Sequence, residues 1–457
     1  MICMKFGGTS VQDAQAIDRI AAIVRERLPE NPVVVVSALA KITDQLLAMA
    51  ASAGAGDRDK ALELSRAARE RHYSTASELL GTSGFAQIHP ELEADFNALD
   101  DLLRGIVAVG ELTLRTTDNV AGFGERISGR MVAAAFSLRG INATSVDSRK
   151  CLVTDANFGR AIPQFEETTA RLAEIVRPLL ARGRVPIMGG FIGSTREGIP
   201  TTLGRGGSDF TAAIVGAGLD ATRIEIWTDV DGMMTTDPTL CPDAKRIKTI
   251  SFEEAAELAY FGAKVLHPAT LLPAIQKNIP VLVLNSRNAK NEGTRITATA
   301  PRSKNIFKAI AAKKRITVVD VVATRMLMAH GFLKSIFDVF ARHRCPVDMV
   351  STSEVSVSVT VDSNESIAAI AADLEKLADV KYEGRKAIVC LVGENIRNTP
   401  GIAARVFGAI PDVTIQMISQ GASEINISFV IDEADVPQVV SRLHRTFFSE
   451  VDPEVFA

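Results

Sequence analysis

A chain of 457 residues is long enough for about two to four domains with a large buried core, so a single small module is excluded. Apolar residues make up 47% and charged residues 23%, which is typical of a folded globular protein and excludes a disordered chain. The net charge is −3, from 51 basic and 54 acidic residues that are interspersed, so neither nucleic acid nor an anionic membrane surface is an expected partner.

The first 300 residues alternate short apolar runs with helical patterns. Residues 32–36, 185–188 and 224–227 are such runs, and residues 44–53 follow a helical spacing. Short apolar runs bounded by Gly, Ser, Asp or Thr are typical of strands buried on both faces of a parallel sheet. The pattern predicts an α/β domain over residues 1–300, with a charge-rich helical insertion between Asp57 and Leu114.

A polar stretch at residues 288–304 predicts a domain boundary. Strand-like and helical segments then follow in the order βαββαβ over residues 315–385, which is the ferredoxin-like split unit. We expect its elements at residues 316–322, 332–343, 347–353, 355–361, 365–377 and 380–383.

A second α+β module follows, but it ends without its final strand. We expect its elements at residues 387–392, 400–409, 413–418, 425–431 and 434–447. The unassigned strand-like segment 306–312 fills the gap when elements are counted. We therefore expect the second module to comprise residues 305–314 and 386–457, with the first module nested within it.

The cysteines and the N-terminal residues are the features that indicate the cellular compartment. The five cysteines are widely spaced, without a C-x-x-C pair, so neither a disulfide framework nor a zinc site is expected. The first residues, MICMKFGGTS, reach a glycine pair too early for a secretory signal, and no stretch of about 18 apolar residues occurs. We expect a soluble protein of the reducing cytoplasm.

The first candidate site is the segment KFGGTS at residues 5–10, between a short strand and a helix expected from Ala14 to Arg25. Its glycines let backbone N–H groups approach an anion, and Lys5 can reach a phosphate. The alternative is a capped helix after a tight turn, because the segment is no Walker A sequence. The lysine and its position favour phosphate binding.

A second glycine-rich segment, TTLGRGGSD at residues 201–209, precedes an alanine-rich helix expected at 210–217. A dinucleotide fingerprint needs Gly where Asp209 stands, so that interpretation is weak. A guanidinium, backbone donors and a carboxylate together suit a carboxylate substrate beside a phosphate. A structural loop with a helix cap is the alternative.

Two further segments, WTDVDG at residues 227–232 and FGAKVLHP at 261–268, combine hydroxyl, carboxylate and lysine side chains with glycine. They suit a nucleotide site, although each alone is more typical of turns. Glu125 is expected at the start of a helix, where an acidic side chain also simply favours the dipole. His267, between Leu266 and Pro268, is interpreted as a packed histidine.

Together the segments KFGGTSV, VSALAKITD, GFGERISGR, TTLGRGGSD, WTDVDG and FGAKVLHPATL, in this order, resemble the aspartokinase family over nearly the whole chain. The monofunctional, lysine-sensitive class is the most similar. The resemblance implies transfer of the γ-phosphoryl group of ATP to the β-carboxylate of L-aspartate, giving 4-phospho-L-aspartate, the first step towards lysine, threonine and methionine. It also implies an amino-acid kinase αβα sandwich followed by two ACT domains.

The resemblance also assigns roles within the site. Lys5 stabilises the transferring phosphoryl group and Asp209 organises Lys5, and no side chain ligates a metal because Mg²⁺ arrives with ATP. The residues implied to hold aspartate are Ser37, Thr43, Glu125, Arg205, Gly206, Gly207 and Ser208. The residues implied to hold the nucleotide are Lys5, Phe6, Gly7, Gly8, Thr228, Asp229, Met234, Thr239, Lys264 and Val265. Met234 and Thr239 replace a Tyr and an Arg that are frequent in the family, so we expect altered ATP binding.

The first ACT module resembles the lysine-sensitive pattern of effector binding. The residues implied are Met326, Gly331, Phe332, Leu333, Val347, Asp348, Ser353, Glu354 and Val355. Asp348 and Glu354 are placed to meet an ammonium group. Ala329 and Pro346 stand where serines are frequent, so both lysine and threonine stay open as effector.

Other functions remain open at this point. A kinase for glutamate or an acetylated amino acid is one, although paired C-terminal modules argue against it. A catalytically silent amino-acid sensor is another, but it leaves Lys5, Glu125, Arg205 and Asp209 unexplained. Whichever function holds, we expect a homodimer or higher assembly through the ACT domains.

Overall fold

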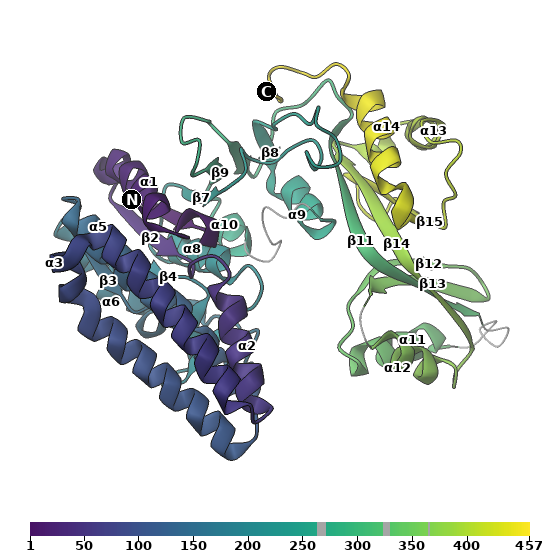
Figure 1. The fold of residues 1–457 in the computed structure, drawn as a ribbon. Helices are drawn as coiled ribbons and strands as arrows, with labels where there is room; N and C mark the ends of the chain where they lie inside the picture. The colour runs from purple at the N-terminus through teal and green to yellow at the C-terminus, as the bar shows by residue number, and fades with distance from the viewer. Residues whose placement is uncertain (263–270, 323–329, 364–365) are drawn as a thin grey trace. The chain divides into compact units, whose positions relative to one another are not determined.

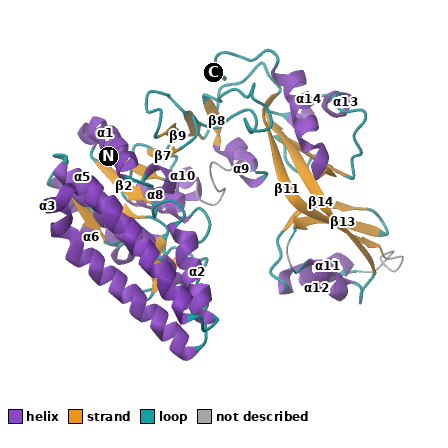
Figure 2. Ribbon diagram, viewed as in Figure 1, coloured by secondary structure: helices purple, strands orange, loops and turns teal. Residues whose placement is uncertain are grey.

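The computed structural model describes residues 1–262, 271–322, 330–363 and 366–457 and contains two compact units. The first unit comprises residues 1–232, 249–252 and 265–300, and the second comprises residues 233–248, 253–264 and 301–457. Each unit contains its own large sheet, drawn in orange in Figure 2.

The first unit is built on an eight-stranded sheet with the order β3-β4-β2-β1-β7-β9-β10-β8. Every pair is parallel except β9 with β10. The strands are β1 Ile2–Phe6, β2 Pro32–Val36, β3 Ala143–Val146, β4 Val185–Gly189, β7 Ile224–Thr228, β8 Thr249–Ser251, β9 Val281–Asn285 and β10 Thr294–Thr297. A separate hairpin pairs β5 Ile192–Ser194 with β6 Pro200–Thr202. The predicted parallel α/β sheet is confirmed.

Buried strands and amphipathic helices form the core of this unit. All five residues of β1 and of β2 are buried, as predicted for strands covered on both faces. Apolar residues of β1, β2, α1 and α5 form one cluster, and residues of α2, α3, α4 and α5 form another. The helices of the unit are α1 Ala14–Arg27, α2 Ile42–Gly54, α3 Arg58–Val109, α4 Leu114–Ala121, α5 Phe123–Leu138, α6 Phe165–Ile175, α7 Arg177–Ala181, α8 Gly207–Gly218 and α10 Leu272–Gln276.

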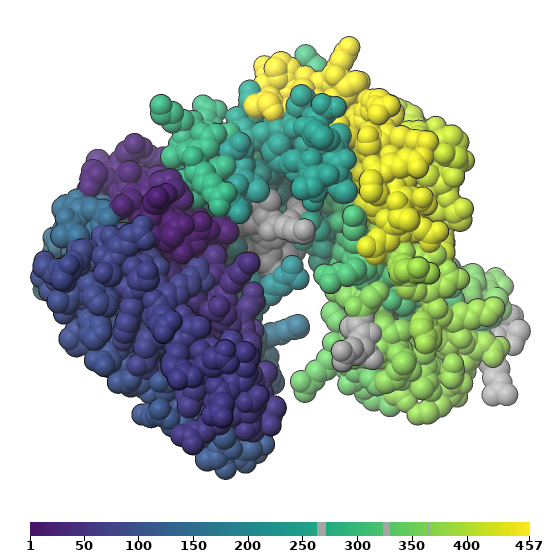
Figure 3. Space-filling view, in the orientation of Figure 1, coloured from purple at the N-terminus to yellow at the C-terminus, as the bar shows by residue number. Residues whose placement is uncertain are grey.

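The predicted helical insertion is confirmed as α3, together with the helices it packs on. It consists of two helical halves that meet at Gly81, whose φ of 66° breaks the helix. Figure 1 shows the two halves beside α2, and Figure 3 shows their atoms packed against those of α2. The apolar residues of the insertion pack against α2 and α5, and not only against the sheet.

The second unit contains a six-stranded antiparallel sheet with the order β12-β13-β11-β14-β16-β15. Helices α11 and α12 lie at one end of the long central strands, and α13 and α14 lie at the other (Figure 1). The elements are α9 Phe252–Tyr260, β11 Phe307–Val322, α11 Phe332–Arg342, β12 Val347–Thr352, β13 Ser356–Asp362, α12 Ile367–Leu374, β14 Asp379–Gly393, α13 Ile402–Gly408, β15 Met417–Gln420, β16 Asn426–Asp432 and α14 Val436–Phe448.

The two central strands differ from the sequence prediction. Segments 306–312 and 316–322, predicted as separate strands, are one strand, β11, and segments 380–383 and 387–392 are one strand, β14. The chain passes the junctions through Arg315 and Arg385, whose φ values are 60° and 56°, and the register shifts between Lys313 and Ile316. Polar residues at these irregular positions look like loops in the sequence, although they lie within a continuous ladder.

The strand predicted at 413–418 is also displaced. In the structure β15 begins at Met417, because the N–H of Val413 bonds to the carbonyl of Ile410 in a turn. In the described part of the chain, no helix is long and apolar enough to cross a membrane.

Candidate active site

The candidate site lies at the carboxyl ends of four neighbouring parallel strands, β4, β2, β1 and β7. In open α/β sheets, ligands bind outside these ends. Backbone hydrogen bonds hold the following loops together, from Ser37 N to Phe6 O at 3.1 Å, from Gly7 N to Trp227 O at 3.2 Å and from Gly190 N to Val36 O at 2.8 Å. The loops that carry the sequence motifs therefore converge on one edge of the sheet.

Lys5 and Asp209 form an ion pair at the centre of this edge. Lys5 Nζ lies 2.6 Å from Asp209 Oδ1, and the two side chains are 11% and 14% exposed. A Cβ atom added at Gly7 would lie 3.5 Å from Lys5 Nζ, so glycine there leaves the ammonium group accessible. Asp209 lies in the first turn of α8, where the helix dipole favours a negative charge. The geometry places a fixed cation beside a glycine turn, as an anion site requires.

Glu125 is a buried carboxylate in the first turn of α5. Its exposed fraction is 3%, and burial raises its pKa to about 7, although the backbone N–H groups of Ala38 and of Glu125 itself stabilise the ionised form. Among the described residues, its Oε2 atom has no hydrogen-bond partner. A Cβ at Gly189 would lie 3.0 Å from the Glu125 carbonyl, so that glycine lets α5 approach β4. A buried carboxylate with one oxygen left without a partner favours a cationic ligand.

The segment at 203–208 begins at β6 and leads into α8. Gly204 and Gly206 have φ values of 76° and 73°, which glycine adopts without strain. Arg205, between them, is exposed, and Ser208 is half-buried. A Cβ at Gly190 would lie 2.7 Å from Ser208 Cβ, so this loop packs closely against the end of β4.

Asp118 of α4 holds the start of this loop, and sequence reasoning did not single it out. Its carboxylate accepts hydrogen bonds from Thr202 N at 2.9 Å, Thr202 Oγ1 at 2.7 Å and Gly159 N at 2.9 Å. Only 3% of Asp118 is exposed. The sequence signal was weak, an acidic residue seven positions before Glu125 on a short helix whose end is not predicted.

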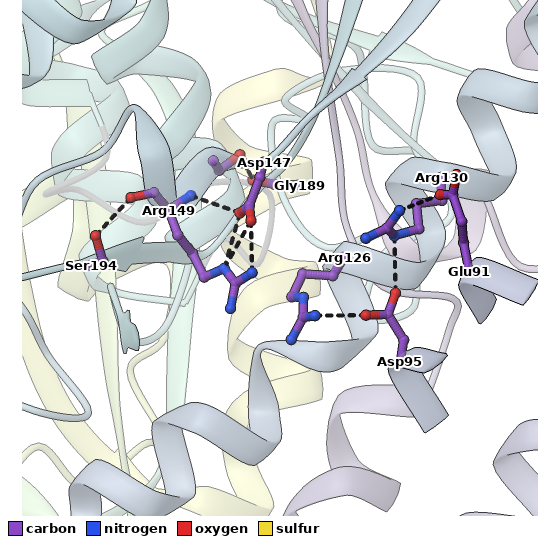
Figure 4. A network of polar contacts seen from close by, with 9 residues as sticks. Glu91, Asp95, Arg126, Arg130, Asp147, Arg149, Gly189 and Ser194 are labelled. Atoms are coloured by element: carbon purple, nitrogen blue, oxygen red, sulfur yellow. Dashed lines mark hydrogen bonds and ion pairs between the residues drawn. The ribbon is translucent and has the colours of Figure 1, made fainter. Parts of the chain in front are cut away.

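Arginines and carboxylates next to Glu125 form a network that sequence reasoning also missed. Figure 4 shows Arg126 and Arg130 of α5 turned towards Asp95 of α3, at 2.6 and 2.9 Å, and Arg149 folded onto Asp147. A cavity of about 30 Å³, room for about one water, lies between Glu125 and this network. The i, i+4 spacing of Arg126 and Arg130 was the available signal. The network fixes the helix that carries Glu125.

The predicted aspartate residues Ser37 and Thr43 lie near this edge. Ser37 follows β2 and Thr43 is in the first turn of α2, and both are half-buried. Gly8 packs against the loop between them, where an added Cβ would lie 3.1 Å from the carbonyl of Ala38.

The predicted nucleotide residues divide between the two units. Thr228 ends β7 and its hydroxyl lies 3.3 Å from the exposed Asp229, in the first unit. Met234 and Thr239 belong to the second unit, where the Thr239 hydroxyl donates to Asp237 at 2.7 Å. Lys264 and Val265, like His267, lie outside the described residues.

The predicted effector residues lie in the second unit. Gly331, with a φ of 84°, precedes α11, which begins with the half-buried Phe332 and the exposed Leu333. Val347 and Asp348 begin β12, and Ser353, Glu354 and Val355 form the turn to β13. Met326 lies outside the described residues.

Asp348 is already engaged by two neighbours. Its carboxylate lies 2.7 and 2.8 Å from Lys313 Nζ, and the Tyr260 hydroxyl donates to it at 2.8 Å. This carboxylate raises the pKa of Tyr260, after the larger effect of burial.

Comparisons with known proteins decide the family. The model of the amino acid kinase family matches residues 1–285, and an ACT domain model matches residues 319–373 and 389–447. The chain is 37% identical over 461 residues to lysine-sensitive aspartokinase 3 of Escherichia coli, covering 98% of this chain and 99% of the relative. This chain belongs to the aspartokinase family. It is also 38% identical over 475 residues to the chloroplastic aspartokinase 1 of Arabidopsis thaliana, covering 98% of this chain and 80% of that protein.

Solved aspartokinase structures agree in fold. The crystal structure of E. coli aspartokinase III with aspartate and ADP superposes with a TM-score of 0.88 at 36% identity, covering 98% of this chain and 100% of that one. The complex of the same enzyme with lysine and aspartate gives a TM-score of 0.83, covering 98% and 99%. The predicted family and the predicted kinase domain with C-terminal ACT domains are confirmed for this aspartokinase.

Proposed function

We propose that this aspartokinase transfers the γ-phosphoryl group of ATP to the β-carboxylate of L-aspartate and is inhibited by an end-product amino acid, foremost lysine. The observation that carries the proposal is the Lys5–Asp209 pair on the same edge of the sheet as the buried Glu125 carboxylate, whose Oε2 atom has no hydrogen-bond partner among the described residues. The relative that superposes at a TM-score of 0.88 holds aspartate and ADP.

Lys5 and Asp209 supply the central electrostatic part of the mechanism. The substrate carboxylate is already ionised, so the reaction needs no general base, only alignment and charge neutralisation. Lys5 balances the charge that spreads over the transferring phosphoryl group. Asp209 holds the Lys5 ammonium in place through the 2.6 Å contact, and the absence of a side chain at Gly7 leaves room for a phosphate beside that ammonium.

The aspartate substrate carries two carboxylates and one ammonium group. Glu125 binds the ammonium group, since its buried Oε2 atom, which has no hydrogen-bond partner among the described residues, gains most from a cation. Arg205 pairs with a carboxylate in the fork geometry of a guanidinium. The remaining polar contacts come from Ser37, Thr43, Gly206, Gly207 and Ser208.

The nucleotide lies over the ends of β1 and β7 in this proposal. Phe6 ends β1 and is followed by Gly7 and Gly8, and Thr228 ends β7 and is followed by Asp229. Met234, Thr239, Lys264 and Val265 are the remaining nucleotide contacts in this proposal. Mg²⁺ bound to ATP neutralises part of the phosphate charge, and no protein side chain is assigned to it.

The second unit is the regulatory part. We assign residues 315–385 to the first ACT module and residues 305–314 with 386–457 to the second, since β11 and β14 each run through both. Under the same proposal, the effector binds at Asp348 and its neighbours. The proposal also includes a homodimer formed by pairing of edge strands, and a cytoplasmic location.

A hydroxamate assay tests the substrate. The enzyme is incubated with ATP, Mg²⁺ and hydroxylamine, together with L-aspartate, L-glutamate or N-acetyl-L-glutamate. We expect coloured hydroxamate with aspartate only, and inhibition by lysine more than by threonine. Hydroxamate formed fastest from glutamate or its acetyl derivative would assign the chain a different acid.

A further inference from the structure

Asp118 connects, through hydrogen bonds, the backbone segments that determine the position of Arg205. Thr202 is the last residue of β6, three positions before Arg205, and both its backbone groups are fixed. Its N–H donates to Asp118 at 2.9 Å, and its carbonyl accepts from Ala161 N at 2.9 Å. Asp118 also accepts from Gly159 N, so it joins the 157–160 turn to the same point.

The loop after Thr202 is packed against that turn. A Cβ at Gly204 would lie 3.0 Å from the Gly159 carbonyl, so the two loops touch through backbone atoms. Arg205 itself is exposed, so its direction is set mainly by the backbone of this loop. A carboxylate with three donors and 3% exposure is a rigid anchor.

We propose that Asp118 is a positioning residue for aspartate binding, which acts by fixing the loop that carries Arg205. The inference rests on the proposed role of Arg205. Loss of the anchor frees the loop, so it weakens aspartate binding more than ATP binding.

The test uses steady-state kinetics of full-length variants. For Asp118→Ala we expect the KM for aspartate to rise about tenfold or more, because the variant loses all three hydrogen bonds that hold the loop, with the KM for ATP within about twofold of wild type. Asp118→Asn keeps an amide oxygen for the two N–H donors, so it should restore most of the loss. Asp100→Ala is the control, because Asp100 accepts from Ser65 and Arg69 far along α3.

Several outcomes decide the question. A folded Asp118→Ala enzyme with an unchanged KM for aspartate, or with both KM values raised equally, overturns the proposal. If Asp118→Ala does not fold, Thr202→Val, which removes only the hydroxyl donor, must still raise the KM for aspartate selectively. If Arg205→Ala leaves the KM for aspartate unchanged, the proposed function of Arg205 fails instead.

A second inference rests on the contacts of Asp348. Its side chain is 4% exposed and is shared by Lys313 and Tyr260, and Lys313 also lies 3.0 Å from Asp362. Tyr260 is the last residue of α9. The carboxylate assigned to an effector ammonium therefore already holds an ammonium from this chain.

Helix α9 is fixed to the six-stranded sheet by three such contacts along one side. Glu254 pairs with Lys308 at 2.9 Å, with side chains 5% and 2% exposed. Glu257 accepts from Asn426 at 2.8 Å, and Tyr260 donates to Asp348. The chain continues from Tyr260 directly into the FGAKVLHP segment that carries Lys264.

We infer that an amino-acid effector competes with Lys313 and Tyr260 for Asp348, and that its binding loosens the end of α9 next to the Lys264 segment. This rests on the proposed effector site. Lys313 then sets the affinity for the effector by competing with it for Asp348. The contact of Tyr260 with Asp348 couples effector binding to α9.

Calorimetry with L-lysine and inhibition curves on the full chain test this. For Lys313→Met we expect the Kd for lysine to fall about threefold or more, and for Tyr260→Phe we expect lysine to bind but to inhibit less. The controls are Lys314→Met and Tyr382→Phe, which alter exposed side chains of β11 and β14. Weaker or unchanged lysine binding by Lys313→Met refutes the competition. If wild type binds neither lysine nor threonine, the proposed effector site itself is wrong.

Discussion

Replacing Glu125 by Gln should have opposite effects on the stability of the substrate-free protein and on aspartate binding. Burial raises the pKa of Glu125 from its ordinary value of 4.5 to about 7. The folded protein therefore favours the protonated carboxyl, and stability falls as the pH rises from about 4.5 to about 7. The difference corresponds to about 3 kcal/mol, because one pKa unit is about 1.4 kcal/mol.

Gln carries no charge, so Glu125→Gln avoids that cost. Without substrate, we expect its free energy of unfolding to exceed that of wild type by up to about 3 kcal/mol at pH 8 and to match it near pH 4.5. Urea denaturation at the two pH values measures this. Glu166→Gln is the control, because Glu166 also lies in the first turn of a helix, α6, but is exposed. Equal stability of Glu125→Gln and wild type at pH 8 would refute the reasoning.

Aspartate binding should depend on pH in the opposite direction to stability, and kinetics measure this. With a pKa of about 7, roughly one tenth of Glu125 is ionised at pH 6 and nine tenths at pH 8. The KM for aspartate should therefore fall about tenfold between these values in wild type. In Glu125→Gln it should be high and nearly independent of pH. A pH-independent KM in wild type contradicts the assigned contact with the ammonium group.

Three further predictions concern packing, a buried ion pair and the nucleotide. Gly190→Ala should lower kcat/KM more than tenfold and cost about 1–3 kcal/mol, because its Cβ would lie 2.7 Å from Ser208 Cβ; kinetics and denaturation measure both, and Gly105→Ala, with open space around it, is the control. Lys308→Met should destabilise the second unit by about 3–5 kcal/mol in thermal or urea unfolding, since it leaves Glu254 charged and buried, and adding Glu254→Leu should recover most of that loss. Thr239→Arg should lower the KM for ATP by supplying a cation, and an unchanged KM would show that Thr239 does not contact the nucleotide.

The sequence predicted the fold where hydrophobic periodicity determines it. Fully buried runs such as residues 32–36 could be assigned to a parallel sheet because every side chain in them is apolar. The continuity of β11 could not be predicted, because Lys313 to Arg315 are polar and the strand that pairs with β11 on both sides of them lies far away in the chain.

Candidate site residues were predictable where glycine and charge coincide. Lys5 and Asp209 stand in glycine-rich segments, and the structure brings them within 2.6 Å of each other. Asp118 was missed because its partners, Thr202 and Gly159, contribute mainly backbone N–H groups that leave no mark in the sequence. Occupation of Asp348 by Lys313 was equally invisible, since it depends on how β11 and β12 each pair with β13, which lies between them.

The most direct test of the account follows phosphoryl transfer by ³¹P NMR with ATP, Mg²⁺ and L-aspartate, in wild type and in Lys5→Met. We expect an acyl phosphate signal that grows together with ADP in wild type. In the folded variant we expect a rate reduced about a hundredfold or more, because removing one aligned charge contact costs about 2.7 kcal/mol or more. Acyl phosphate formation at the wild-type rate by Lys5→Met, or none by wild type, would contradict this expectation.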